Sequence, residues 1–252
     1  MSGLRRLSHC WADHAGDTVK TAILGAAAIL AALPASAVPQ PQLSPIDRNF
    51  TPFASYRSMQ AYHVAVRDAL LRTASHHSCE AMVLPSFQRE WAVYIQRRGN
   101  VHEVVYAVMR EQLWGRMQEA AERPDGSIEP GDEVPALEKL SRETRTSSAP
   151  LSQATAEVLA HLCATMLARA QQPPEPPRCI DGTSYYVFQR DSLGVARGGS
   201  GSCPQPGTPT ASLLAILEDL REAAESSGSS LARSDVSLAR KATQLLQKLP
   251  LQ

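Results

Sequence analysis

Five cysteines are the residues of this chain whose chemistry is easiest to interpret. Cys10 lies near the N-terminus, whereas Cys79, Cys163, Cys179 and Cys203 lie after a predicted export signal. In an exported protein an even number of cysteines predicts disulfides, and four cysteines allow three pairings. We therefore expect two disulfides in the exported part.

A hairpin argument selects one of these pairings. Residues 185–188 have the composition of a strand and residues 191–194 that of a turn. Cys179 and Cys203 each lie twelve residues from position 191. The arms of a hairpin would bring them within the roughly 5.5–6 Å Cα separation of a disulfide. We predict Cys179–Cys203, which leaves Cys79–Cys163 to join the first helix to a later one.

A metal site would have to use His76, His77 and Cys79. Their spacing matches no standard zinc pattern, and adjacent histidines cannot easily face one ion. A catalytic thiol is disfavoured in an oxidising compartment, and the chain has no C-x-x-C motif. The sequence therefore predicts no metal ion and no cofactor.

Two short segments have the residue types of catalytic or phosphate-binding loops. Asp181-Gly182-Thr183 could place a catalytic aspartate at a strand edge, but we favour a turn into the strand Tyr185–Phe188. Residues 198–202 read Gly-Gly-Ser-Gly-Ser, which matches neither a P-loop nor a nucleophile elbow. We expect a flexible loop there.

The histidines His63, His102 and His161 are scattered along the chain. His161 adjoins the apolar stripe of a predicted helix, so we expect it to be partly buried and hydrogen-bonded. A Ser-His-Asp triad is recognised by its geometry rather than by sequence position. Without a local motif, these residues predict no catalytic site.

A group of aromatic residues is the first candidate for a binding surface, because exposed aromatic side chains anchor interfaces well. Alternation in a strand would put Trp91, Val93 and Ile95 on one face and Tyr94 on the other. We favour the interpretation that most of these aromatic side chains belong to the core, since aromatic residues make up only 5% of the chain. The predicted surface consists of Trp91, Tyr94, Trp114, Tyr185 and Tyr186.

The N-terminal segment predicts export. Lys20 is followed by apolar residues 21–33 and by Ala35-Ser36-Ala37, which matches a cleavage signal. This apolar stretch spans roughly 20 Å as a helix, which is short of the roughly 30 Å hydrocarbon layer. We predict a cleaved signal peptide over residues 1–37, no stable membrane anchor, and a periplasmic or secreted protein. Because two aspartates and a tryptophan precede Lys20, we expect translation to start at Val19; the alternative is a long leader starting at Met1.

The elements that follow predict an α+β fold. A Pro-rich lead-in over 38–53 precedes a single α+β domain over 54–227, and a helical tail over 228–252 ends the chain. Apolar spacing predicts helices over about 54–77, from Ser152 onwards and from Thr208 onwards. Strands are predicted over 87–96 and 101–109, with a second hairpin over 179–203. We therefore expect a small antiparallel sheet of two hairpins, stapled by disulfides, with helices packed on one face.

One pattern resembles a family of uncharacterised exported bacterial proteins. It consists of Pro85-Ser86-Phe87, Glu90-Trp91-Ala92-Val93 and Leu113-Trp114, followed by a helix and then by Asp181-Gly182-Thr183-Ser184-Tyr185. The resemblance covers residues 79–220 and implies a shared domain. It implies no activity for any residue.

The charge balance disfavours nucleic-acid binding. Lys and Arg total 25, as do Asp and Glu, and without the leader the balance is 22 to 23. A nucleic-acid-binding protein usually has a basic face. We predict a non-enzymatic module that binds another protein or an envelope component. The alternative is a cell-envelope hydrolase with His161 or Asp181 in a cleft.

Overall fold

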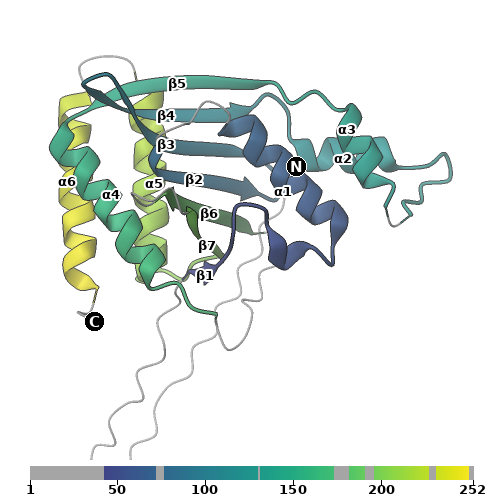
Figure 1. The fold of residues 1–252 in the computed structure, drawn as a ribbon. Helices are drawn as coiled ribbons and strands as arrows, with labels where there is room; N and C mark the ends of the chain where they lie inside the picture. The colour runs from purple at the N-terminus through teal and green to yellow at the C-terminus, as the bar shows by residue number, and fades with distance from the viewer. Residues whose placement is uncertain are drawn as a thin grey trace, which may run out of the picture. The chain divides into compact units, whose positions relative to one another are not determined.

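The computed structural model describes residues 43–71, 77–129, 131–172, 182–190, 196–226 and 231–249. The predicted signal peptide lies outside these residues. The described elements combine helices with antiparallel strands, which makes the fold α+β (Figure 1). In chain order they are β1 Ser44–Pro45, the 3-10 helix η1 Thr51–Phe53, α1 Arg57–Leu70, β2 His77–Pro85, β3 Trp91–Arg98, β4 Val101–Met109, α2 Leu113–Ala121, α3 Glu133–Lys139, β5 Thr144–Leu151, α4 Gln153–Ala168, β6 Thr183–Arg190, β7 Ala196–Ser202, α5 Pro209–Glu225 and α6 Leu231–Lys248.

The strands form one seven-stranded antiparallel sheet in the order β1-β7-β6-β2-β3-β4-β5. The predicted small sheet of two hairpins therefore has fewer strands than the observed sheet. The hairpin β3–β4 is confirmed, and Gly99 occupies its turn with a φ of 62°. The second hairpin, β6–β7, joins the same sheet because β6 pairs with β2 over six residue positions.

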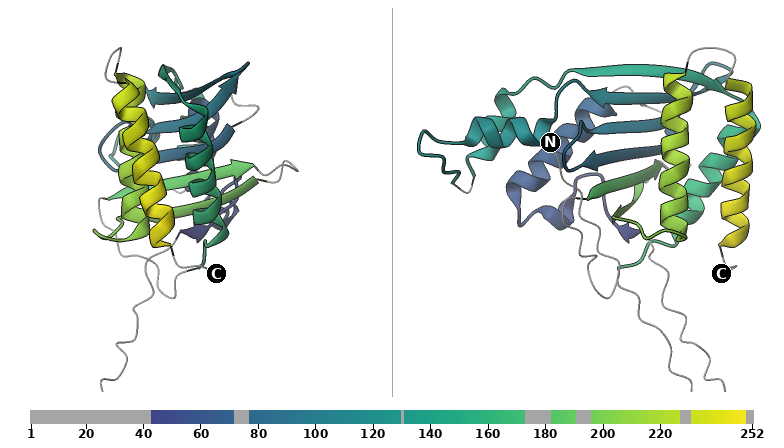
Figure 2. Two further views of the ribbon diagram at one scale, coloured as in Figure 1. Left: turned by 90° about the vertical axis from the view of Figure 1, so that its left-hand side faces the viewer. Right: turned by 180° about the vertical axis from the view of Figure 1, so that it is seen from behind.

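Helices pack on both faces of this sheet, which corrects the prediction of one covered face. Side chains alternate across a strand, so β2 directs Ala81 and Val83 toward α4, α5 and α6, and it directs Met82 and Leu84 toward α1 and α2. Figures 1 and 2 show α4, α5 and α6 grouped together, apart from α1, α2 and α3. The fold thus has two apolar cores separated by the sheet.

The segments expected at the two ends of the domain contribute to these cores. Leu43 and Phe50, from the predicted lead-in, are buried, and β1 pairs with β7. Leu238 and Ala242 of α6, from the predicted tail, are buried in the same core as α4 and α5. Apolar burial therefore continues beyond the boundaries that composition suggested.

The glycine-rich segment is a strand rather than a flexible loop. It forms most of β7, which pairs with β6. A Cβ atom built on Gly198 would lie 2.7 Å from a carbon of the Phe188 ring, and one on Gly201 would lie 2.8 Å from a carbon of the Tyr185 ring. The aromatic side chains of β6 thus fill the space that side chains of β7 would occupy.

The predicted disulfide Cys79–Cys163 is confirmed, with its Cα atoms 6.1 Å apart. Cys79 lies on β2, not on the first helix, so the bond joins the sheet to α4. Cys203 is disulfide-bonded as well. Its predicted partner Cys179 lies outside the described residues. The ladder places Cys203 opposite Thr183, whose carbonyl accepts from the Cys203 N–H at 3.2 Å, so the hairpin register differs from the predicted one.

The helix starts predicted at Ser152 and Thr208 are confirmed, and each of these residues caps its helix. The Ser152 side chain accepts a hydrogen bond from the backbone N–H of Thr155 at the start of α4. Thr208 accepts from the N–H of Ala211 at the start of α5, where Pro209 occupies the first helical position. Polar side chains at these positions pair backbone donors that have no partner within the helix.

Candidate functional site

The aromatic residues considered as a candidate binding surface are mostly in the core, as the favoured interpretation predicts. Trp91, Tyr94, Tyr185 and Tyr186 are all buried. Trp91 and Tyr185 face α4, α5 and α6, whereas Tyr94 and Tyr186 face α1. The expected alternation is therefore right, and these four side chains belong to the core rather than to a binding surface, because helices cover both faces. Trp114 alone of the five is partly exposed.

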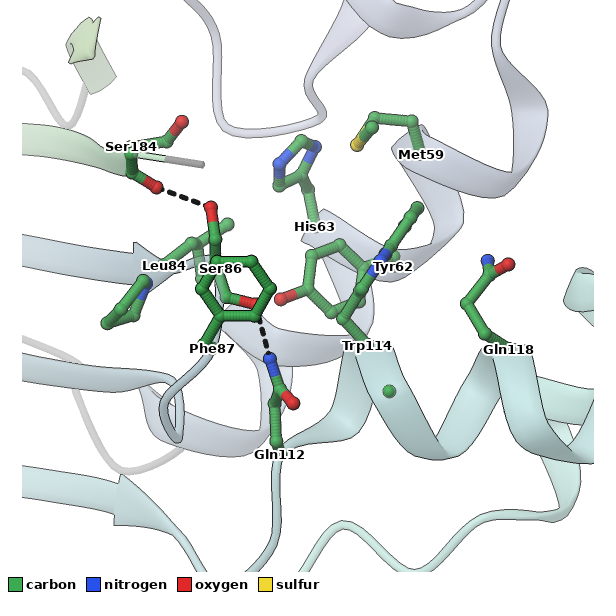
Figure 3. Close-up of a pocket in the computed structure, with 13 residues that line it drawn as sticks. Met59, Tyr62, His63, Leu84, Ser86, Phe87, Gln112, Trp114, Gln118 and Ser184 are labelled. Atoms are coloured by element: carbon green, nitrogen blue, oxygen red, sulfur yellow. Dashed lines mark hydrogen bonds between the residues drawn. The ribbon is translucent and has the colours of Figure 1, made fainter. Parts of the chain in front are cut away.

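Trp114 lines an open cleft with a volume of about 490 Å³. The cleft lies where α1, α2 and the turn between β2 and β3 converge at the end of β6 (Figure 3). This volume lies within the roughly 300–1,000 Å³ of small-ligand sites. Its lining residues are Met59, Tyr62, His63, Leu84, Pro85, Ser86, Phe87, Gln112, Trp114, Gly115, Gln118, Gly182 and Ser184.

Aromatic and aliphatic side chains form the walls of the cleft, and one of these side chains is unusually exposed. Phe87, in the turn after β2, is 76% exposed. Figure 3 shows its ring at the cleft, with Trp114 and Gln118 projecting from α2 and with Met59 and His63 on α1. Phe87 therefore adds exposed aromatic surface to the half-buried Trp114 at the same cleft.

A fully buried carboxylate holds the elements around the cleft together. Glu90 has no exposed surface and accepts hydrogen bonds from the Tyr62 hydroxyl at 2.8 Å and from the backbone N–H groups of Leu113 at 2.9 Å and Trp114 at 3.0 Å. These two N–H groups begin α2, whose N-cap residue Gln112 supplies no side-chain cap. The positive end of the helix dipole stabilises the negative charge. Burial, and then the Glu90 charge, raise the pKa of Tyr62 far above its usual value, so the phenol stays a donor.

His63 lies beside Tyr62 on α1 and is held by other aromatic groups. Its Nε2 lies 3.0 Å from the Tyr186 hydroxyl, and its ring stacks on Phe50 with centroids 5.0 Å apart. Burial lowers the pKa of His63 to about 4, so the ring is neutral near pH 7. Its Nδ1 is buried and has no hydrogen-bond partner among the described residues.

The polar groups of the cleft differ in whether they are already paired. The Ser86 hydroxyl donates to the Gly182 carbonyl at 2.6 Å, and the Gln112 amide donates to the Ser86 carbonyl at 2.7 Å (Figure 3). Ser184 pairs with the Ser202 hydroxyl at 3.1 Å. The Gln118 side chain makes no hydrogen bond to any described residue. The lining residues that the structure describes include no Asp, Glu, Lys or Arg.

A second buried polar group lies on the same face of the sheet but does not line this cleft. His77 Nδ1 lies 3.2 Å from Glu80 Oε1, and Arg48 pairs with the other Glu80 oxygen. The His77 ring stacks on Tyr94 with centroids 4.0 Å apart. Arg48 also lies over the Phe188 ring, 5.5 Å from its centroid. This network connects the segment between β1 and η1, which carries Arg48, to the sheet.

The remaining candidates from sequence are not gathered at the cleft. His161 is exposed on α4, which packs on the opposite face of the sheet, so the expectation of a partly buried residue was wrong. His102 pairs with Leu151 in the ladder between β4 and β5. Asp181 and His76 lie outside the described residues. Cys79 is in a disulfide, and no group of three or more His, Cys, Asp or Glu in the described ranges could hold a metal ion.

Sequence reasoning missed His63, Glu90, Phe87 and Gln118 as residues of one site. Glu90 stood inside the motif Glu90-Trp91-Ala92-Val93, but nothing local indicated that its carboxylate would be buried. Three separate stretches of chain supply these residues, so their proximity follows from the sheet register and from the packing of α1 and α2. Trp114 was the one residue of this cleft that the sequence indicated, because it was among the five candidate binding residues.

Comparisons of the chain with protein-family models, with curated proteins and with solved structures found no match. The resemblance to exported bacterial proteins therefore stays a prediction. None of the helices within the described ranges has the length and apolar character needed to cross a bilayer.

Proposed function

We propose that this protein is a non-catalytic binding module that holds an uncharged, partly apolar ligand in the cleft between α1 and α2. One observation carries the proposal: a concave site of about 490 Å³ presents aromatic walls, its described lining residues include no Asp, Glu, Lys or Arg, and Phe87 at this site is 76% exposed. Ligand sites are typically apolar clefts with few polar groups that fix orientation. The cleft of this chain has that composition.

The chemistry around the cleft supports binding more than catalysis. The Glu90 carboxylate is enclosed and already accepts three hydrogen bonds, so it serves to position Tyr62 and α2. The Ser86 hydroxyl donates to a backbone carbonyl rather than to a histidine. A nucleophile needs a base within hydrogen-bond reach.

We further propose that the module works outside the cytosol, in the periplasm or after secretion, where it meets another protein or an envelope component. The disulfide between Cys79 and Cys163 supports this location, because structural disulfides persist in oxidising compartments. The predicted leader over residues 1–37 supports it as well.

Binding of an uncharged fluorophore tests the proposed cleft. N-Phenyl-1-naphthylamine should increase in fluorescence on addition of the disulfide-intact protein, because its rings would enter the cleft beside Phe87 and Trp114. Phe87→Ser should reduce the enhancement at least fivefold. Val236→Ser is the matched control, since Val236 on α6 is 68% exposed yet lies on the other side of the sheet. Equal loss in both variants, or no enhancement with the wild type, would refute the proposal.

A further inference from the structure

One polar atom at the cleft, Nδ1 of His63, is buried and has no hydrogen-bond partner among the described residues. The side chains of Tyr62, Ser86 and Gln112 at the same cleft already make hydrogen bonds. Gln118 is partly exposed, so water can bond to its amide. His63 is only 4% exposed. A buried ring nitrogen without a partner costs free energy, so Nδ1 is the atom at which a ligand would gain most from a hydrogen bond.

Aromatic side chains hold the His63 ring in a fixed orientation. The Phe50 ring stacks on it with centroids 5.0 Å apart, and the Phe53 ring is tilted against it at 4.9 Å. Its other nitrogen, Nε2, lies 3.0 Å from the Tyr186 hydroxyl. The edge of the ring that carries Nδ1 is therefore the one that lacks a polar contact.

The hydrogen bonds behind His63 decide which of its nitrogens carries the proton. Burial raises the pKa of Tyr186 far above its usual value, although the Ser184 hydroxyl, which donates to the Tyr186 oxygen, acts in the opposite direction. Tyr186 thus keeps its proton and donates it to Nε2 of His63. Burial lowers the pKa of His63 to about 4, so near pH 7 the ring is neutral and holds one proton. With Nε2 as acceptor, that proton lies on Nδ1, which is then a donor.

Met59 lies beside this donor. It precedes His63 by one turn on the same face of α1, and both side chains line the cleft (Figure 3). Nδ1 itself has almost no surface in contact with water, so a ligand reaches it when the Met59 side chain moves aside. Methionine is unbranched and flexible, which lowers the cost of that movement.

We propose that His63 selects the ligand of the cleft by donating a hydrogen bond from Nδ1 to a carbonyl oxygen. This inference rests on the proposed function and narrows the ligand to an apolar carbonyl compound. A carbonyl oxygen only accepts hydrogen bonds, as an N–H donor requires, whereas a ligand hydroxyl would also bring a proton that needs an acceptor of its own. Phe87 and Trp114 would contact the apolar part of the same ligand.

Two fluorophores that differ in one carbonyl group test this role. The ketone 6-propionyl-2-dimethylaminonaphthalene and its 6-propyl analogue share their rings, but only the ketone carries an acceptor for Nδ1–H. The disulfide-intact protein should bind the ketone about fivefold more tightly than the analogue, as expected for one net hydrogen bond. This preference should disappear in His63→Phe, while the affinity for the analogue is retained, since a double-mutant cycle isolates the shared interaction.

His161→Phe is the matched control, because His161 is exposed on α4, on the other face of the sheet. This variant should keep the wild-type preference for the ketone. An equal preference in the wild type and in His63→Phe would overturn the role of His63.

The position of the proton is measured on the wild type, so the test does not depend on the folding of a variant. In protein labelled with ¹⁵N at histidine, a long-range ¹H–¹⁵N correlation spectrum at pH 7 distinguishes a protonated ring nitrogen from an unprotonated one. The His63 signals are identified by nuclear Overhauser contacts with the Phe50 ring. The proton should lie on Nδ1, and the Nδ1 signal should shift when the ketone is added. A proton on Nε2, or an unchanged Nδ1 signal in the bound protein, would overturn the inference.

These outcomes separate the role of His63 from the proposed function. If N-phenyl-1-naphthylamine and the propyl analogue bind but the ketone binds no more tightly than the analogue, His63 does not select the ligand and the binding cleft stands. If none of the three fluorophores binds, both the role of His63 and the proposed function are refuted.

Discussion

The two faces of the sheet are built from different chemistry. The face covered by α4, α5 and α6 buries mainly aliphatic side chains and carries the Cys79–Cys163 bond. The face covered by α1 and α2 contains all four buried histidine and glutamate side chains of the described residues, His63, His77, Glu80 and Glu90, among aromatic rings. Aliphatic burial stabilises a fold without directional demands, whereas buried polar groups must be paired one by one. The difference teaches that the first face is built for stability and that the second, which carries the cleft, is built to hold groups in place.

Removing the disulfide should show the largest effect and should act on stability alone. A cross-link between cysteines with a sequence separation of 84 contributes about 4.5 kcal/mol in the chain-entropy description. The variant Cys79→Ala/Cys163→Ala should lose about that much free energy of unfolding, measured in guanidinium under non-reducing conditions. Fluorophore binding by the folded fraction should persist, because the cleft lies on the other face. Loss of binding with little loss of stability would contradict the division between the faces.

Acid should act on the α1 face through His63. Burial lowers its pKa to about 4, below the usual value near 6.5, so the unfolded chain binds the proton more tightly than the folded one. This contribution to stability is complete above about pH 6.5 and is lost as the pH falls toward 4, by about 3 kcal/mol in total. The free energy of unfolding, measured at each pH from 7 to 4, should therefore fall more steeply in the wild type than in His63→Gln. His161→Gln, at an exposed position on α4, is the control and should follow the wild-type profile.

Neutralising the buried Glu90 carboxylate should lower the free energy of unfolding by less than acid does, but it should affect both stability and binding. In Glu90→Gln, an amide NH₂ group replaces one of the two carboxylate oxygens that accept from the N–H groups of Leu113 and Trp114. The NH₂ group is a donor and cannot accept, so the charge-assisted cap on α2 is lost. We expect a loss of about 2 kcal/mol in unfolding free energy. Weaker binding of N-phenyl-1-naphthylamine should accompany it, because Trp114 is displaced. Unchanged binding with unchanged stability would mean that the carboxylate does not position α2.

A cap on the other face gives the matched comparison and the smallest effect. Ser152→Ala removes the side-chain acceptor for the Thr155 N–H at the start of α4. Helix caps of this kind contribute about 1 kcal/mol. The variant should lose that amount in guanidinium unfolding and keep its fluorophore binding. An effect on binding as large as that of Glu90→Gln would show that the two faces are coupled.

Features that depend on a few neighbouring residues were predictable from the sequence. The hairpin β3–β4 follows from β-branched residues around Gly99, and the starts of α4 and α5 follow from Ser152, Thr208 and Pro209. The pairing of Cys79 with Cys163 was also predicted, although by elimination. The strand β5 was missed, because its polar residues and Pro150 hide the alternation that marks a strand, as is common at the edge of a sheet.

The sequence by itself determined that this chain alternates helices with antiparallel strands, where two of its helices begin, and which side chains share a face of β3. Each of these depends on local backbone preference or on the period of apolar residues. Only the tertiary structure decided that helices cover both faces, which buries Trp91, Tyr94, Tyr185 and Tyr186 and leaves Phe87 in water. It also decided that Glu90 meets Tyr62 and the start of α2. Burial and the pairing of charges depend on which distant segments come together, and a local pattern does not contain that information.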